Sequence, residues 1–128
     1  MTSKIIRYPS DLPYPVAKAV QLGDLLFLSG QVSMSKTGES IYGSVDTQTR
    51  NTMDSIKATL QELGASLDSV VRVTVWLSDI KYFPEFNKAY ESYFPNGFPA
   101  RSTVQSLPAA NLDVEIEVTA VKRMRPAI

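Results

Sequence analysis

The most constraining feature of the sequence is the segment 112–121, in which apolar and polar residues alternate. The apolar positions are Leu112, Val114, Ile116, Val118 and Ala120, and the positions between them are Asp113, Glu115, Glu117, Thr119 and Val121. Successive side chains of a β-strand point to opposite faces of its sheet, so this pattern predicts a strand with one buried and one largely polar face. The buried face needs a second layer to cover it.

Two segments predict the helices of that second layer. The first is expected to run from Asp46, the predicted N-cap, to a stop at Gly64. Its core stripe recurs at steps of three and four residues and consists of Thr49, Met53, Ile56, Leu60 and Leu63. The second helix follows a turn at 79–82 and has Pro84 in its first turn. Its stripe is aromatic and is interpreted as a face packed on the sheet: Phe83, Phe86, Ala89, Tyr90, Tyr93 and Phe94.

The other segments predict further strands. Segment 70–77 is rich in β-branched residues, and Val71, Val73, Val75 and Leu77 are expected to form its core face. Segments 16–22 and 25–28 predict a hairpin, while 5–8 and 102–105 add strands. This order of hairpins and strand–helix–strand steps predicts an α+β fold, a mixed sheet with two helices on one face. Without an internal repeat or linker, residues 1–128 are expected to be a single domain.

The composition excludes several classes of function. Lys plus Arg and Asp plus Glu number 13 each, so a nucleic-acid binder that relies on bulk positive charge is disfavoured, while self-association is permitted. The sequence has no Cys and no His, which excludes thiolate nucleophiles, the Ser–His couple and the usual zinc sites. Neither a phosphate loop nor a dinucleotide fingerprint is present. Catalysis would therefore use carboxylates, Lys, Arg, Tyr, hydroxyls, the backbone or water.

The location of the protein is also an expectation from sequence. The first four residues lack the long apolar core of a signal peptide, and no apolar run approaches membrane-spanning length. We therefore expect a soluble, cytoplasmic protein.

Arg101 is the first candidate functional residue. It follows Phe98-Pro99-Ala100 at the start of a predicted strand, where the rigid lead-in of Pro99 holds the backbone. The planar fork of a guanidinium matches a carboxylate by two parallel hydrogen bonds. The residues themselves leave two interpretations open: Arg101 binds an anionic ligand, or it pairs with a carboxylate of its own chain.

Two further positions are candidates. Ser29-Gly30 follows a predicted strand, and is either a ligand-facing strand end or a bulge. Glu115 and Glu117 share the face of the sheet away from the helices, together with Arg72 and Trp76. These carboxylates either act as an acid or base in a desolvated site or face solvent.

Six segments, taken in order, resemble the reactive intermediate deaminase (Rid, YjgF-like) family. They are 23–31, which ends in Ser-Gly-Gln; 48–50 with 64–65; 70–79; 87–90 with Phe94; 99–104, which reads Pro-Ala-Arg-Ser-Thr-Val; and 107–108 with 114–117. The likeness covers nearly the whole chain in one register.

The resemblance implies a chorismate-mutase-like fold, assembled as a homotrimer with sites between subunits. It implies hydrolysis of enamine and imine intermediates to 2-keto acids and ammonia, as in 2-iminobutanoate/2-iminopropanoate deaminases, without a metal or cofactor. By the same resemblance Arg101 clamps the substrate carboxylate and Glu115 positions water. Ser29, Gly30, Thr103 and Asn87 are expected to bind substrate.

One position departs from the family pattern. Val16 stands where many members carry a site tyrosine, so Val16 is expected to line the site and to alter the substrate range. Three functions stay open at this point: an imine deaminase, a non-catalytic small-carboxylate-binding or chaperone-like trimer, and an endoribonuclease. The third is the least compatible with a neutral chain.

Overall fold

The computed structural model describes residues 4–122, and residues 1–3 and 123–128 lie outside this range. The described chain forms one sheet in the order β1-β2-β3-β7-β5-β6, with β4 also paired to β7. The β5–β6 pair is parallel and the other pairs are antiparallel, as expected for a mixed sheet. The strands are β1 (Ile5–Pro9), β2 (Ala17–Leu22), β3 (Leu25–Leu28), β4 (Gln31–Val32), β5 (Val70–Leu77), β6 (Ala100–Gln105) and β7 (Val114–Val121).

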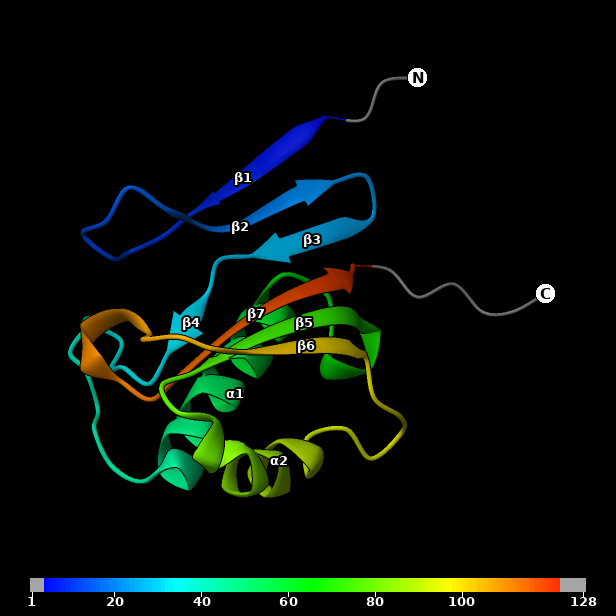
Figure 1. Cartoon of the computed structure of the whole chain (residues 1–128). Helices are drawn as coiled ribbons and strands as arrows, with labels where there is room; N and C mark the ends of the chain where they lie inside the picture. The colour runs from blue at the N-terminus through cyan, green and yellow to red at the C-terminus, as the bar shows by residue number, and fades with distance from the viewer. Residues whose placement is uncertain (1–3, 123–128) are drawn as a thin grey trace.

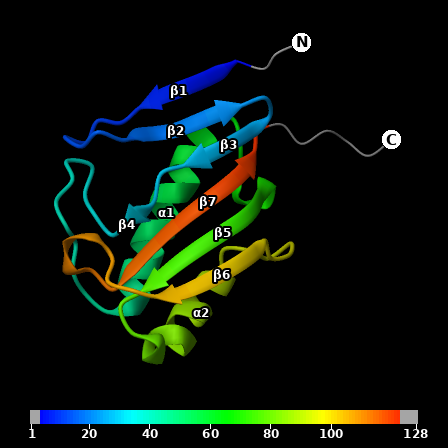
Figure 2. The same ribbon diagram turned by 45° about the horizontal axis from the view of Figure 1, so that its top comes forward.

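Two helices, α1 (Val45–Glu62) and α2 (Phe83–Glu91), lie on the same side of this sheet (Figures 1 and 2). The apolar residues of β7 form the centre of the core, and each is at most 1% exposed: Val114, Ile116, Val118 and Ala120. The predicted stripe of α1 packs against them, with Met53, Ile56 and Leu60 fully buried. Burial of each such side chain stabilises the fold by about 1.5–3 kcal/mol. The predicted α+β architecture is therefore confirmed.

The start of α1 differs from the prediction. Ser44, not Asp46, is the N-cap, because its Oγ accepts a hydrogen bond of 3.1 Å from the backbone N–H of Thr47. Asp46 lies inside the first turn, where its carboxylate pairs with Arg50 at 3.1 Å. The predicted stop at Gly64 is confirmed by its φ of +81°, the left-handed region that glycine adopts without strain.

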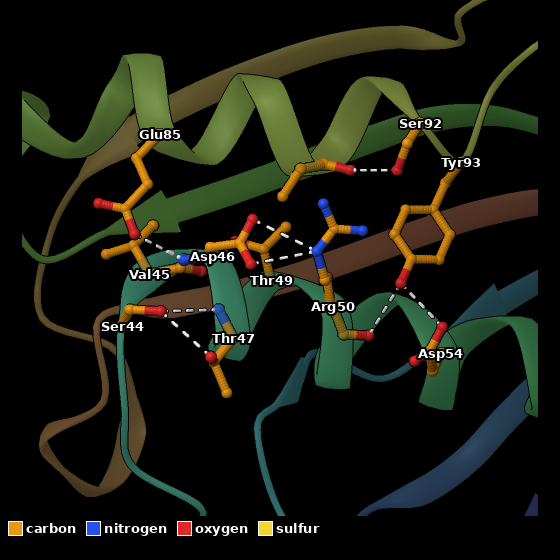
Figure 3. Close-up of polar contacts among 11 residues, drawn as sticks. Ser44, Val45, Asp46, Thr47, Thr49, Arg50, Asp54, Glu85, Ser92 and Tyr93 are labelled. Carbon is orange, nitrogen blue, oxygen red and sulfur yellow. Dashed lines mark hydrogen bonds and ion pairs between the residues drawn. The ribbon is translucent and has the colours of Figure 1, made fainter.

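Polar contacts join α1 to α2 at their exposed edge (Figure 3). The Glu85 carboxylate of α2 accepts a 2.8 Å hydrogen bond from the backbone N–H of Asp46. Tyr93, just after α2, donates its hydroxyl to Asp54 of α1 at 2.8 Å. Burial, together with this hydrogen bond, raises the pKa of Tyr93 to about 12. The two helices therefore hold each other in place as well as packing on the sheet.

A bulge in β5 overturns one core assignment. Val70 pairs with Ala120 but Arg72 pairs with Thr119, so Val71 is an extra residue opposite one step of β7. Val71 is consequently 47% exposed, whereas Val70 is 6% exposed and belongs to the core. The prediction of Val71 as a core residue was wrong because strict alternation does not hold across a bulge.

The sheet face away from the helices is partly apolar. In the predicted hairpin, β2 and β3 meet at a turn where Gly23 has a φ of 59°. Leu26 and Leu28 of β3 face the helices, while Leu25 and Phe27 are exposed on the opposite side. Within residues 4–122, no helix has the length and apolar character needed to cross a membrane.

Candidate functional site

Arg101 is the second residue of β6 and lies opposite Val73 in the parallel β5–β6 register. Its side chain lies against α2, and its Nη2 donates a hydrogen bond of 2.8 Å to Oδ1 of Asn87. The side chain is half-buried. The strand and the helix together therefore hold the guanidinium in one orientation.

An aromatic surface on α2 supports the guanidinium. The Arg101 Cζ atom lies 5.5 Å from the ring centroids of both Phe83 and Phe86 and 4.9 Å from that of Tyr90. Cation–π contacts of this kind are each worth about 0.5–2 kcal/mol. Tyr90 is itself stacked on Phe86 at 5.3 Å and packed against Phe94 at 4.9 Å. Phe86, Tyr90 and Phe94 of the aromatic stripe are thus buried in the core as predicted, whereas Phe83 is 37% exposed. The stripe also positions Arg101.

Arg101 forms no ion pair among the described residues. Within residues 4–122, the guanidinium makes a single hydrogen bond, to Asn87, which leaves four of its five N–H groups for a ligand. The competing interpretation, a pair with a carboxylate of its own chain, does not hold for this part of the chain. Arg101 can therefore accept an anion from outside.

The guanidinium lies in the wall of a cavity of about 330 Å³. The cavity is lined by Asn87, Tyr90, Glu91, Phe98, Pro99 and Arg101. Tyr90 contributes a buried hydroxyl that has no hydrogen-bond partner in the described chain. Burial raises the pKa of Tyr90 to about 12 although nearby Arg101 acts in the opposite direction, so this hydroxyl is protonated at neutral pH.

Glu115 and Gly30 form a second group of candidate residues. Glu115 is half-buried on β7, and its Oε1 accepts a 3.3 Å hydrogen bond from the backbone N–H of Ala109. Gly30 directly precedes β4, which pairs with β7 beside Glu115. A Cβ at position 30 would lie only 2.6 Å from Glu115 Oε2, so the carboxylate packs against a surface that only glycine leaves open.

Ser29 and Val16 lie next to this group. The Ser29 hydroxyl donates a 2.6 Å hydrogen bond to the carbonyl of Ala17, and its backbone N–H bonds to Lys18 at 3.2 Å. Val16 is exposed just before β2. Both residues and Gly30 line a cavity of about 560 Å³ between the β2 and β4 segments and α1. The Ser29 hydroxyl is held as a donor to its own chain, which leaves its oxygen as an acceptor for a ligand.

Within one chain the two groups are separate. Arg101 and Thr103 of β6 face the helix side, where their β5 partners Val73 and Val75 are buried. Glu115 lies on the opposite face of β7, with β5 between the two strands. The structure therefore brings Arg101 together with Asn87, and Glu115 together with Gly30, but not Arg101 with Glu115.

Three residues at the site were not predicted as site residues from sequence. Glu91 and Phe98 line the Arg101 cavity, and Phe83 lies under the guanidinium. The available signal was the spacing of Asn87 and Glu91, because residues four apart share one face of a helix. Among residues 4–122, no group of three or more Asp, Glu, His or Cys side chains is placed to hold a metal ion.

The chain is similar to known proteins over most of its length. The family model described as Endoribonuclease L-PSP matches residues 9–122. A RutC family protein of Saccharolobus solfataricus is 42% identical over 84% of this chain and 85% of the relative, and one of Pyrococcus abyssi is 40% identical over 84% of each. The crystal structure of yeast Mmf1 has a TM-score of 0.87 at 30% identity and covers 94% of this chain and 100% of its own.

A second solved structure agrees with these likenesses. The YjgF gene product of E. coli has a TM-score of 0.81 at 32% identity, covering 91% of this chain and 94% of its own. The match spans the segments that carry Gly30, Arg101 and Glu115. The chain therefore belongs to the YjgF/Rid family, whose model is described as Endoribonuclease L-PSP.

Proposed function

We propose that this protein is a deaminase of 2-imino acids, which hydrolyses reactive imines and their enamine tautomers to 2-keto acids and ammonia. Substrates of the 2-iminobutanoate and 2-iminopropanoate type fit the proposal. Membership of the YjgF/Rid family supports it. The observation that carries it is Arg101, a guanidinium held by Asn87 and an aromatic surface, without a carboxylate partner in residues 4–122, in the wall of a cavity.

Arg101 binds the substrate carboxylate in this proposal. Its free N–H groups suit a bidentate pair with a planar anion, and the surrounding aromatic rings lower the local polarity, which strengthens the pair. Asn87 does not bind the substrate through its Oδ1 atom, because that atom accepts a hydrogen bond from Arg101 Nη2 and so orients the guanidinium. The backbone N–H of Thr103, on the edge strand β6, is a further donor for the carboxylate.

The chemical step requires only placement of water. The carbon of a protonated imine is already electrophilic, so a positioned water adds to it while Glu115 accepts a proton from that water. The resulting aminoalcohol then loses ammonia: its nitrogen is protonated, the C–N bond breaks, and the hydroxyl proton leaves as the keto C=O forms. Holding two reactants in register in this way supplies several kcal/mol of the barrier reduction.

The separation of the two groups leads us to propose a homotrimer with sites between subunits. Arg101, Asn87 and Thr103 of one subunit would face Gly30, Ser29, Val16 and Glu115 of the next. The exposed apolar residues Leu25 and Phe27 on the sheet face away from the helices, and the zero net charge, are compatible with such an assembly.

Turnover is tested by generating imines in place with an amino-acid oxidase and following keto-acid release. Wild-type protein should accelerate release, and both Arg101→Ala and Glu115→Gln should lose the effect. Keto-acid binding without any acceleration by the wild type would identify a non-catalytic binding protein instead.

The shared site is tested by co-expressing Arg101→Ala and Glu115→Gln subunits with different tags. In a cyclic trimer, roughly one site in three of each mixed assembly would combine an intact Arg101 with an intact Glu115. Tandem-purified mixed oligomers should therefore regain activity that neither variant has alone. No recovery in mixed oligomers would overturn the shared arrangement.

A second candidate function is RNA cleavage, favoured by the description of the matching family. The same Arg101→Ala variant separates the two activities. Cleavage of single-stranded RNA by wild type that is lost in the variant would support this candidate. Equal cleavage by both proteins would assign it to a contaminant or another site.

A further inference from the structure

The cavity beside Arg101 also has an acidic side. Glu91 lies four residues after Asn87 on α2, so both residues are on the face that borders the cavity. The side chain of Glu91 makes no hydrogen bond or ion pair within residues 4–122, and it does not pair with Arg101. A single cavity thus contains a fixed cation and a separate, exposed carboxylate.

The remaining wall is apolar. Phe98 is 65% exposed and borders the cavity together with Pro99. Its ring is tilted against that of Phe94 with centroids 6.4 Å apart, which connects it to the core. A ligand whose carboxylate is bound by Arg101 therefore has its other end beside an apolar surface and a negative charge.

We propose that Glu91 is a specificity-determining residue, which selects 2-imino acids by the charge of their side chain. Neutral and cationic side chains are accepted between Glu91 and Phe98, whereas a second carboxylate on the substrate is repelled. This inference rests on the proposed deaminase function, because it names the substrate class of the same site.

The size of the effect follows from the exposure of Glu91. Two like charges in contact with water are partly screened, so the discrimination is modest and depends on salt. We expect Glu91 to disfavour a dicarboxylic substrate roughly fivefold relative to a monocarboxylic one of equal length at low ionic strength. The preference should shrink as salt is added.

The test compares kcat/KM for imines generated from norvaline and from glutamate, which have the same chain length but differ in side-chain charge. In Glu91→Gln the ratio of glutamate-derived to norvaline-derived kcat/KM should rise roughly fivefold at low salt. Glu39→Gln is the matched control, because it removes the same charge from an exposed loop residue outside this cavity, and it should leave the ratio at the wild-type value.

A binding measurement keeps this inference separate from the proposed function. The affinities of 2-oxopentanoate and 2-oxoglutarate, both unreactive, are measured by calorimetry for wild type and Glu91→Gln. A rise in relative 2-oxoglutarate affinity in the variant supports the role of Glu91 even if wild type shows no turnover. An unchanged ratio in both assays, or a change that salt does not affect, overturns it.

Discussion

Replacing Gly30 with alanine is the most direct test of the contact between Gly30 and Glu115. The added Cβ would lie 2.6 Å from Glu115 Oε2, whereas ordinary van der Waals contact begins at 3.4 Å. The carboxylate must therefore move by about 0.8 Å, the difference between these two distances. The backbone of Gly30 does not have the positive φ that would exclude alanine, so the clash with the carboxylate is the main consequence.

The expected result is a loss of activity without a matching loss of stability. A misplacement of about 1 Å in a catalytic group can reduce turnover about 100-fold. The free energy of unfolding should change by less than about 1 kcal/mol, because the group that moves is the end of a flexible side chain and alanine restricts the unfolded chain. Turnover of an oxidase-generated imine and urea unfolding measure the two quantities.

A double-mutant cycle shows whether the effect passes through Glu115. Glu115→Ala is itself expected to lose most of the turnover, so the cycle is read on the residual kcat/KM of that background. There the space beside residue 30 is open, and Gly30→Ala should have little further effect. The reasoning is refuted if Gly30→Ala retains wild-type turnover, or if it reduces turnover equally in both backgrounds.

Three further predictions concern stability. Tyr90→Phe removes an unpartnered buried hydroxyl, so the free energy of unfolding at pH 7 should stay constant or rise by about 1 kcal/mol. The pKa of Tyr90 is raised from 10.0 to about 12 in the folded protein, so the wild type should lose stability as the pH rises from 10 towards 12. Tyr90→Phe should lose less stability over the same range. An equal loss in both proteins, measured by urea unfolding at alkaline pH, would contradict this. Ser44→Ala should lower the free energy of unfolding by about 1 kcal/mol and Asp46→Ala by less, as measured by urea unfolding. A larger loss in Asp46→Ala than in Ser44→Ala would identify Asp46 as the N-cap instead. Ala110→Gly should raise the urea midpoint and increase the free energy of unfolding by up to about 1 kcal/mol, because Ala110 has a φ of 60°, which glycine adopts without strain. A lower midpoint would show that this conformation is not strained.

The sequence allowed most of the fold to be predicted because its main elements are amphipathic. The alternation of 112–121 and the three-and-four spacing in α1 each match one periodicity, and burial follows directly from it. Prediction failed where one residue breaks the period. Val71 is exposed because of a bulge. Ser44 replaces Asp46 as the N-cap because the helix already begins at Val45, where the Ser44 hydroxyl reaches the backbone N–H of Thr47.

The candidate site was predictable in its residue types but not in its arrangement. The strand after Pro99 and the planar fork of Arg101 left an anion site and an internal ion pair both open. The family resemblance indicated that Arg101 binds the substrate carboxylate and that Glu115 positions water. The aromatic spacing in α2 predicts only a packing face, because helical spacing does not say which side chain of another element lies against it. The contact of Gly30 with Glu115 depends on residues 85 positions apart in the sequence, which local patterns do not encode.

The sequence by itself determined most of the buried positions and the chemical groups that are available, because periodicity and composition are local properties of the chain. Only the tertiary structure decided that Arg101 joins Asn87 on one side of the sheet while Glu115 joins Gly30 on the other. The physical reason is that strand order and register are set by packing between distant segments, and these place β5 between the two strands that carry the charged groups.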